Sequence, residues 1–282
     1  MGTPPSLKVG YPLQTVKEER MYEDIIYQKE DDVARIKINR PKMMNSFRMQ
    51  TLNEMLEAML DAANDKSIGV IVISAEGGRA FCSGGDISEM RELTFDTGRI
   101  FVTKLYQVFQ AIRWAPKPVI AAVDGYCLGG GNELNMVCDL SIATERSVFG
   151  QVGPTVGSTP VLAGTQYLPR NVGDKRAKEI IFLCQRYPAK DAQAMGWINK
   201  VVPDGTLDEA VKEWTDRILS MSPQALRISK ISLNFESDLL NPSFMHGVEM
   251  LCSTYGSDEL KEGMTAFLEK RKPDFAKFRK RL

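Results

Sequence analysis

The stretch AAVDGYCLGGGNELNMVCD, residues 121–139, decides how this chain is expected to fold. Two apolar runs are separated by three consecutive glycines, and one acidic residue, Glu133, follows them on an otherwise apolar segment. Glycine has no Cβ, so Gly129, Gly130 and Gly131 allow a tight turn and let a ligand approach bare backbone N–H groups. The residues after the triplet have the pattern of a mostly buried helix.

A glycine turn that opens a helix presents unpaired N–H donors and the positive end of the helix dipole to whatever lies in front of it. A negative charge would be stabilised there, and Glu133, one turn into the helix, could move protons beside it. The pattern indicates an oxyanion site with its own acid or base. The alternative is an ordinary strand-to-helix turn whose glutamate reaches solvent.

A second glycine-rich loop lies upstream. The loop GGRAFCSGGD, residues 77–86, follows an apolar strand expected at 70–73, and the glycine triplet follows another expected at 118–123. Ligands gather at the carboxyl ends of strands in open α/β sheets. If the two strands are neighbours, Gly85 and Gly130 each direct an N–H at one carbonyl oxygen, the usual way to stabilise an oxyanion.

The rest of the chain fits an α/β fold, because short apolar strands separated by helices indicate a parallel sheet covered on both faces. A loose arm is expected at residues 1–20. A hairpin is expected around Asp31 and Asp32, further strands at 140–143 and 198–202, and helices at 49–63, 101–114, 177–183 and 189–195. From residue 207 the pattern is nearly all helical, with segments at 207–221, 223–235, 244–255 and 258–270.

Composition excludes several function classes. The 282 residues are 43% apolar and 26% charged, as in an ordinary globular protein. Lys+Arg and Asp+Glu both number 36. A nucleic-acid binder normally has a basic excess, so that role is disfavoured. The locally basic residues 270–280 still suit a small polyanion such as a nucleotide phosphate.

The cysteines and the single histidine bear on location and chemistry. Five scattered cysteines favour reduced thiols in a cytoplasmic protein over a disulfide framework. No CxxC pair exists, so a metal site is not expected. A Ser-His-Asp triad would need His246, which lies at helical spacing and is better interpreted as structural. No signal peptide and no apolar run of membrane-spanning length is found, so no membrane role is expected.

Several motifs in order resemble the crotonase (enoyl-CoA hydratase/isomerase) superfamily: RAFCSGGDI, the 121–139 stretch, FGQVG and AGTQYLPRNVG. The resemblance implies a spiral of ββα units at 21–205 and a helical trimerisation region at 206–282, assembled as trimers or dimers of trimers. It implies an acyl-CoA thioester substrate whose carbonyl lies between the N–H groups of Gly85 and Gly130. Coenzyme A is then part of the substrate, and no tightly bound cofactor is expected.

Within the superfamily the chain most resembles 1,4-dihydroxy-2-naphthoyl-CoA synthases and 2-oxocyclohexanecarbonyl-CoA hydrolases, through GQVGPTVGS, KRAKEIIFLCQRY, TYGSDELKEGMTAF and KRKPDFAKF. That likeness implies substrate contacts from Ser158 and from Tyr255, the latter reaching over from a neighbouring subunit. It assigns CoA binding to Arg40, Lys42, Ser83, Asp86, Ile87 and Lys277. For Arg40 and Lys42 the alternative is a solvated strand end.

The chain departs from both sets of relatives. Ordinary hydratases use two glutamates; Glu133 matches the first, but the second falls on Gly153. The naphthoate synthases have an apolar residue at the position of Glu133, and an aspartate of theirs falls on Pro160. Losing a positioned acid or base typically costs about 10²–10⁴ in rate, so neither standard route applies unchanged.

What remains is one carboxylate in an expected apolar pocket formed by Gly153, Pro154, Pro160, Val161 and Leu162. Burial there should raise the pKa of Glu133 toward neutrality. The first hypothesis is hydrolytic opening of a cyclic β-oxoacyl-CoA in alicyclic or aromatic degradation. Hydration of a cyclic or conjugated enoyl-CoA is second and naphthoate-type ring closure third. A non-catalytic acyl-CoA-binding relative is the alternative from another class.

Overall fold

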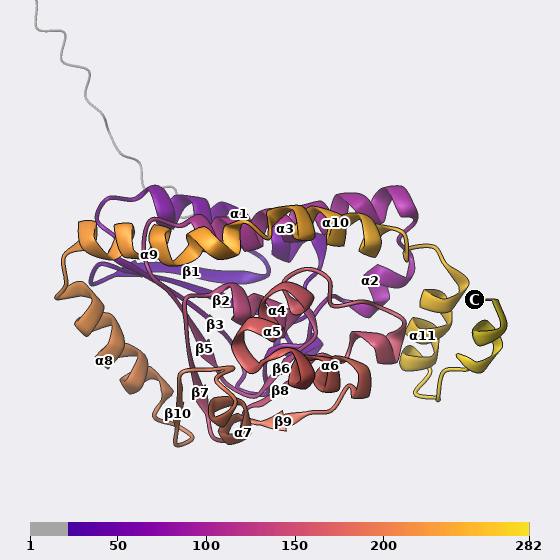
Figure 1. Ribbon diagram of the computed structural model, residues 1–282. Coiled ribbons are helices and arrows are strands. Elements are labelled where there is room, and N and C mark those ends of the chain that lie inside the picture. The colour runs from indigo at the N-terminus through magenta and orange to yellow at the C-terminus, as the bar shows by residue number, and fades with distance from the viewer. Residues whose placement is uncertain (1–21, 282) are drawn as a thin grey trace, which may run out of the picture.

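The computed structural model describes residues 22–281, so the arm expected at 1–20 lies outside the described residues. The chain forms an α/β fold with a mainly parallel sheet and a helical C-terminal region, which confirms the predicted fold class (Figure 1).

The main sheet has six strands in the order β1-β2-β3-β5-β7-β10, and all neighbours run parallel except the β1–β2 hairpin. The bounds are Ile25–Glu30, Val33–Ile38, Val70–Ala75, Val119–Val123, Leu140–Thr144 and Lys200–Val202. The neighbouring positions of β3 and β5 are what the convergence of the two glycine loops requires.

A second, smaller sheet has the order β4-β6-β8-β9, with bounds Ala80–Cys82, Tyr126–Leu128, Val148–Gly150 and Tyr187–Pro188. β4, β6 and β8 each follow a strand of the main sheet and run parallel to one another, which gives repeated ββα units. These strands could not be predicted from the sequence, because two or three residues are too few to show a period.

The helices before residue 200 are α1 to α7, with bounds Met49–Asn64, Ile87–Arg91, Phe95–Trp114, Gly130–Val137, Gly164–Val172, Asp174–Leu183 and Ala189–Ala194. α3 begins earlier than predicted because Thr94 caps it, accepting a hydrogen bond from the Thr97 N–H. α5 was not predicted because it begins at a glycine and contains Pro169, both of which disfavour helix.

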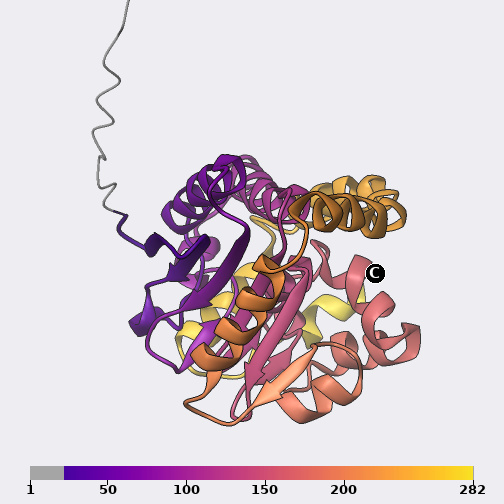
Figure 2. The ribbon, with the colours of Figure 1, turned by 90° about the vertical axis from the view of Figure 1, so that its left-hand side faces the viewer.

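The C-terminal part contains α8 (Leu207–Leu219), α9 (Pro223–Asp238), α10 (Asn241–Cys252) and α11 (Asp258–Leu268). α8 covers one face of the main sheet, where Val70, Val72 and Ile120 pack with Val211 (Figure 2). The alternate strand residues, Ile71, Ile73 and Ala121 among them, point to the opposite face and join the larger core under α1 and α3.

The last two helices return to the core of their own chain. α10 lies along α3, and α11 lies against the short 3-10 helix η2 (Gly153–Val156) at the end of the molecule away from α8 (Figure 1). The contact is close, since a Cβ on Gly263 of α11 would lie 2.4 Å from the Val156 carbonyl carbon. α11 also packs on α2, the helix that follows the first glycine loop.

Candidate active site

The two glycine loops lie against each other. Gly85 follows β4 and Gly130 follows β6, and these strands are parallel neighbours. A Cβ placed on Gly84 would lie 3.0 Å from the Gly130 amide nitrogen. Gly84 has φ +99° and Gly129 has φ +54°, a region that side chains disfavour, so both turns depend on glycine.

The backbone N–H groups of Gly85 and Gly130 are directed away from their local partners. Phe47 donates its N–H to the Gly84 carbonyl (2.8 Å) and accepts from the Asp86 N–H (2.7 Å), so the Gly85 N–H points to the opposite side. Gly130 is the first residue of α4, where N–H groups have no acceptor within the helix. Among the described residues neither N–H has a hydrogen-bond acceptor. Each of these N–H groups is therefore free to bind a ligand atom.

Glu133 lies in the first turn of α4 and is only 6% exposed. Its Oε1 accepts a hydrogen bond from the Gly164 N–H at 3.1 Å. Burial raises the pKa of Glu133 to about 8, and backbone hydrogen bonds from Gly164 and Leu162 oppose that rise only partly. A carboxyl group with this pKa can both accept and return a proton near neutral pH.

These groups line one cavity of about 60 Å³. Glu133 is its only ionisable carboxylate among the described residues. Most of the other lining side chains are apolar: Met90, Phe101, Leu105, Pro160 and Leu251. Gly85, Gly130, Gly153 and Ser158 also line it. Glu133 thus shares a small, largely apolar space with both free amides.

Three of the residues expected in the pocket lie elsewhere. Pro154 is in η2, but it does not line the cavity. Leu162 is fully buried in the core. The Val161 carbonyl faces α10, where a Cβ on Gly247 would lie 2.1 Å from it. The Val161 and Leu162 side chains pack in the core, and only the Leu162 backbone contacts the site, through a hydrogen bond to the Glu133 carboxylate.

Tyr255 occupies a place that the sequence analysis did not expect. The resemblance implied a tyrosine from a neighbouring subunit, whereas here Tyr255 is buried and lines the cavity of its own chain. The reason is that α10 lies along α3, where Gly98 leaves room for the ring: a Cβ there would lie 2.5 Å from Cδ2 of Tyr255. Burial, reinforced by the nearby Cys252 and Glu133, raises the pKa of the Tyr255 hydroxyl.

The residues assigned to CoA differ in how far they are already engaged. Arg40 donates to Ser46 O at 2.5 Å and pairs with Asp86 at 3.0 Å, so its guanidinium is held inside the protein. Asp86 also caps α2 through the Ser88 N–H. Lys42 is exposed in the 3-10 helix η1 (Pro41–Met43).

Ser83, on the same glycine loop as Gly85, and Ile87, the first residue of α2, are partly exposed. Lys277 lies in a separate hollow of about 430 Å³, 3.3 Å from Glu262. CoA binding by all six of these residues stays a prediction.

Several lining residues were not predicted, among them Gln151, whose side-chain amide can both donate and accept hydrogen bonds. It directly follows β8 and is fully buried. A polar residue inside the otherwise apolar run VFGQV was the available signal.

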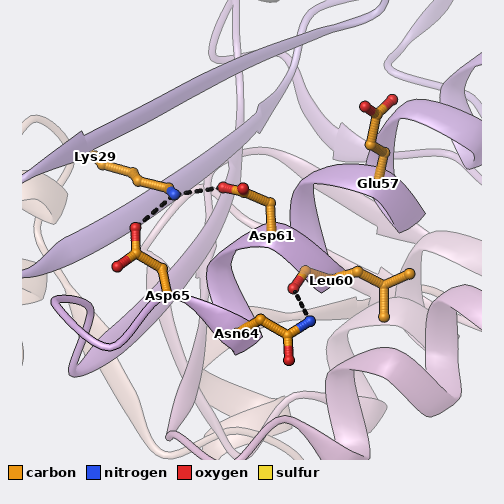
Figure 3. Close-up of a pocket in the computed structure, with 6 residues that line it drawn as sticks. All are labelled: Lys29, Glu57, Leu60, Asp61, Asn64 and Asp65. Atoms are coloured by element: carbon orange, nitrogen blue, oxygen red, sulfur yellow. Dashed lines mark hydrogen bonds and ion pairs between the residues drawn. The ribbon is translucent and has the colours of Figure 1, made fainter. Parts of the chain in front are cut away.

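The described residues contain other features that do not form a rival site. A hollow of about 490 Å³ lies between β1 and α1, but Lys29 is ion-paired there with Asp61 and Asp65 at 2.5 and 2.6 Å (Figure 3). His246 is exposed on α10. No group of three or more metal-ligating side chains occurs in the part of the chain described. None of its helices is long and apolar enough to cross a bilayer.

The chain is similar in sequence and fold to known proteins of one family. The enoyl-CoA hydratase/isomerase family model matches residues 28–278. The structure is similar to an enoyl-CoA hydratase from Mycobacterium avium subsp. paratuberculosis K-10, with a TM-score of 0.83 and 27% identity over 90% of this chain and 99% of that chain. An enoyl-CoA hydratase/isomerase from Xanthobacter autotrophicus Py2 gives a TM-score of 0.81 and 30% identity, covering 89% of this chain and 98% of the other. An enoyl-CoA hydratase from Bacillus anthracis gives a TM-score of 0.73 and 30% identity, covering 90% of this chain and 99% of the other. Because this family model covers most of the chain, the chain belongs to the enoyl-CoA hydratase/isomerase family, the crotonase superfamily.

Proposed function

We propose that this protein catalyses a water-using, enolate-forming reaction on an acyl-CoA thioester, with Glu133 as the only carboxyl group that moves protons. The proposal rests on the position of Glu133. Among the residues that the structure describes, it is the single ionisable carboxylate lining the cavity, which Gly85 and Gly130 also line. The two amides stabilise the thioester oxygen as it gains charge. Gly153, in place of a second glutamate, leaves Glu133 to act alone.

The leading reaction is hydrolytic opening of a cyclic β-oxoacyl-CoA. Glu133 takes a proton from water, and the water oxygen adds to the ring ketone. The bond between the ketone carbon and the α-carbon then breaks, and its electron pair forms a thioester enolate held by Gly85 and Gly130. Protonated Glu133 returns the proton to the α-carbon, which yields an open-chain acyl-CoA with a free carboxyl group. One acid-base group suffices for every step.

Hydration of a cyclic or conjugated enoyl-CoA is the second candidate, favoured by the family to which the chain belongs. The same glutamate would deliver water to the β-carbon and a proton to the α-carbon. Naphthoate-type ring closure is less well supported, because Pro160 occupies the position expected for an aspartate. A role in binding alone is less well supported, because binding does not require a buried carboxyl group with a raised pKa.

Product mass separates these reactions. The purified protein is incubated with a panel of cyclic β-oxoacyl-CoA and cyclic enoyl-CoA thioesters, and the products are read by mass spectrometry. Uptake of one water that gives a free carboxylic acid supports ring opening, and a hydroxyacyl-CoA supports hydration. Binding of thioesters with no conversion of any of them would contradict the proposal.

We also infer that the chain assembles with copies of itself, as trimers or dimers of trimers. α9 exposes an apolar stripe at helical spacing, formed by Ile228, Ile231 and Phe235 and continued by Leu239 at the end of the helix. Such a stripe on the surface of a single chain is typical of an interface. Light scattering on Ile231→Glu tests this: a loss of mass relative to the wild type supports assembly through α9, and a monomeric wild type contradicts it.

A further inference from the structure

Three polar side chains that face the cavity lack hydrogen-bond partners. Gln151 is fully buried, and neither its Nε2 nor its Oε1 has a partner among the described residues. The same holds for the Thr159 hydroxyl and the Tyr255 hydroxyl. All three residues line the cavity that contains Glu133.

This grouping is unusual. Buried polar atoms in proteins are nearly always paired, and an unpaired one costs stability that an apolar residue of the same shape would avoid. The three residues come from separate parts of the chain: the segment after β8, the loop before α5 and the turn after α10. Their convergence on one space indicates that their partner is a ligand atom.

Their position relative to Glu133 indicates which ligand atom that is. A Cβ on Gly164 would lie 3.0 Å from Gln151 Nε2 and 3.1 Å from Glu133 Oε1, so the amide and the carboxyl border the same small region. Glu133 is also close enough to Tyr255 to influence its ionisation. The thioester oxygen is served by Gly85 and Gly130. The polar cluster beside Glu133 is therefore available to a second oxygen, near the carbon that Glu133 hydrates.

We propose that Gln151, Thr159 and Tyr255 form a subsite for an oxygen atom carried near the β-carbon of the acyl group, with Gln151 Nε2 as the main donor. The substrate class is then an acyl-CoA with a ketone or hydroxyl at that position. This inference rests on the proposed function, because it takes Glu133 as the group beside the reacting carbon. If the oxygen is a ring ketone, these donors also stabilise the charge it gains when water adds.

The test compares two ligands that differ only in this oxygen, 2-oxocyclohexanecarbonyl-CoA and cyclohexanecarbonyl-CoA. Dissociation constants are measured by calorimetry in the Glu133→Gln background, to suppress turnover, with Gln151 intact, with Gln151→Met, and with the matched control Gln28→Met. Gln28 is exposed on β1, away from the cavity. Methionine keeps the length of glutamine without its donors.

With Gln151 intact, the oxo ligand is expected to bind at least about tenfold more tightly, the effect of one good hydrogen bond. Gln151→Met should reduce that preference to about threefold or less, and Gln28→Met should leave it unchanged. An equal preference for the oxo ligand with and without the Gln151 amide would overturn the proposed subsite. A second result would also overturn it. If the single variant Gln151→Met lost turnover equally with every substrate but kept the preference for the oxo ligand, the amide would hold water instead of substrate.

Stability provides a second readout. If Gln151 has a purely structural role, Gln151→Met should have a lower melting temperature than the wild type. If its amide instead serves a ligand, the melting temperature should be unchanged or higher. A fall in melting temperature together with an unchanged ligand preference overturns the inference. Failure of the proposed function itself is recognised separately, by full turnover in Glu133→Gln.

Discussion

The backbone N–H of Gly164 donates a 3.1 Å hydrogen bond to Oε1 of Glu133, and this contact joins the start of α5 to the first turn of α4. Because the donor is a backbone group, the carboxyl orientation depends on the fold and not on another side chain. The bond is too weak to offset burial, so the pKa of Glu133 stays at about 8. Glu133 therefore has a fixed orientation and a pKa that suits proton transfer near neutral pH.

The pH dependence of activity follows from that acidity. The first step of the proposed reaction needs the Glu133 carboxylate, which is the minor form below its pKa of about 8. We expect kcat/KM to rise about tenfold per pH unit below that value and to level off above it. A profile that is flat from pH 6 to 9 would show that Glu133 does not act as the base.

The same pKa predicts how stability changes with pH. The folded protein keeps Glu133 protonated at pH values where the unfolded chain, with its ordinary carboxyl, has released the proton. Stability from this group is therefore complete below the ordinary glutamate pKa and is lost as the pH rises to about 8. Across that pH range, the free energy of unfolding of Glu133→Gln should rise relative to that of the wild type by about 1.4 kcal/mol per pH unit. Urea unfolding at pH 5 and pH 8 measures the gain, and an equal difference at both pH values would refute the buried, neutral carboxyl.

The oxyanion site can be tested through Gly84. In Gly84→Ala the new methyl group would lie 3.0 Å from the Gly130 nitrogen, at a residue with φ +99°. We expect kcat to fall about 10²–10³-fold, as when one oxyanion donor is lost. Gly205→Ala is the matched control, because Gly205 has φ +86° and no atom within 4 Å of a Cβ. Equal activity losses in both variants would mean that strain, not the amide, is responsible.

The sequence predicted most of the fold because its long elements are strongly periodic. The apolar strands at 70–73 and 118–123 appear as β3 and β5, and the helix predicted at 49–63 appears as α1. The second sheet could not be predicted, since strands such as Ala80–Cys82 are held by their neighbours and have no period of their own.

The family resemblance also named Ser158, Tyr255, Gly153 and Pro160, which line the cavity. Without the resemblance, the site was predictable only where a residue's role is set by its own backbone. Gly85 and Gly130 fall at strand ends, and Glu133 falls one turn into a helix, so local pattern was enough to nominate them. Gln151 and Tyr255 reach the cavity through tertiary packing. Tyr255 depends on the missing side chain at Gly98, and no local pattern shows that such a gap exists.

Arg40 and Lys42 are expected to behave differently when mutated. Arg40→Ala leaves the buried Asp86 without an ion-pair partner, whereas Asp24 keeps Arg48 at 2.7 Å. The unpaired Asp86 should lower the free energy of unfolding by about 3 kcal/mol or more. Lys42→Ala should leave the free energy of unfolding unchanged, because the Lys42 side chain is exposed. The same variant should raise KM for CoA thioesters about threefold or more, because one phosphate contact is lost. Urea unfolding and steady-state kinetics check both. An unchanged KM in Lys42→Ala would remove that residue from the CoA site.

The most direct measurement is exchange of the α-proton of a bound acyl-CoA for deuterium in D₂O, followed by mass spectrometry for the wild type and for Glu133→Gln. The wild type should incorporate one deuterium, and the variant should do so about 10²–10⁴-fold more slowly while binding the thioester equally well. Exchange at the wild-type rate in Glu133→Gln would contradict the assignment of Glu133 as the group that moves the proton.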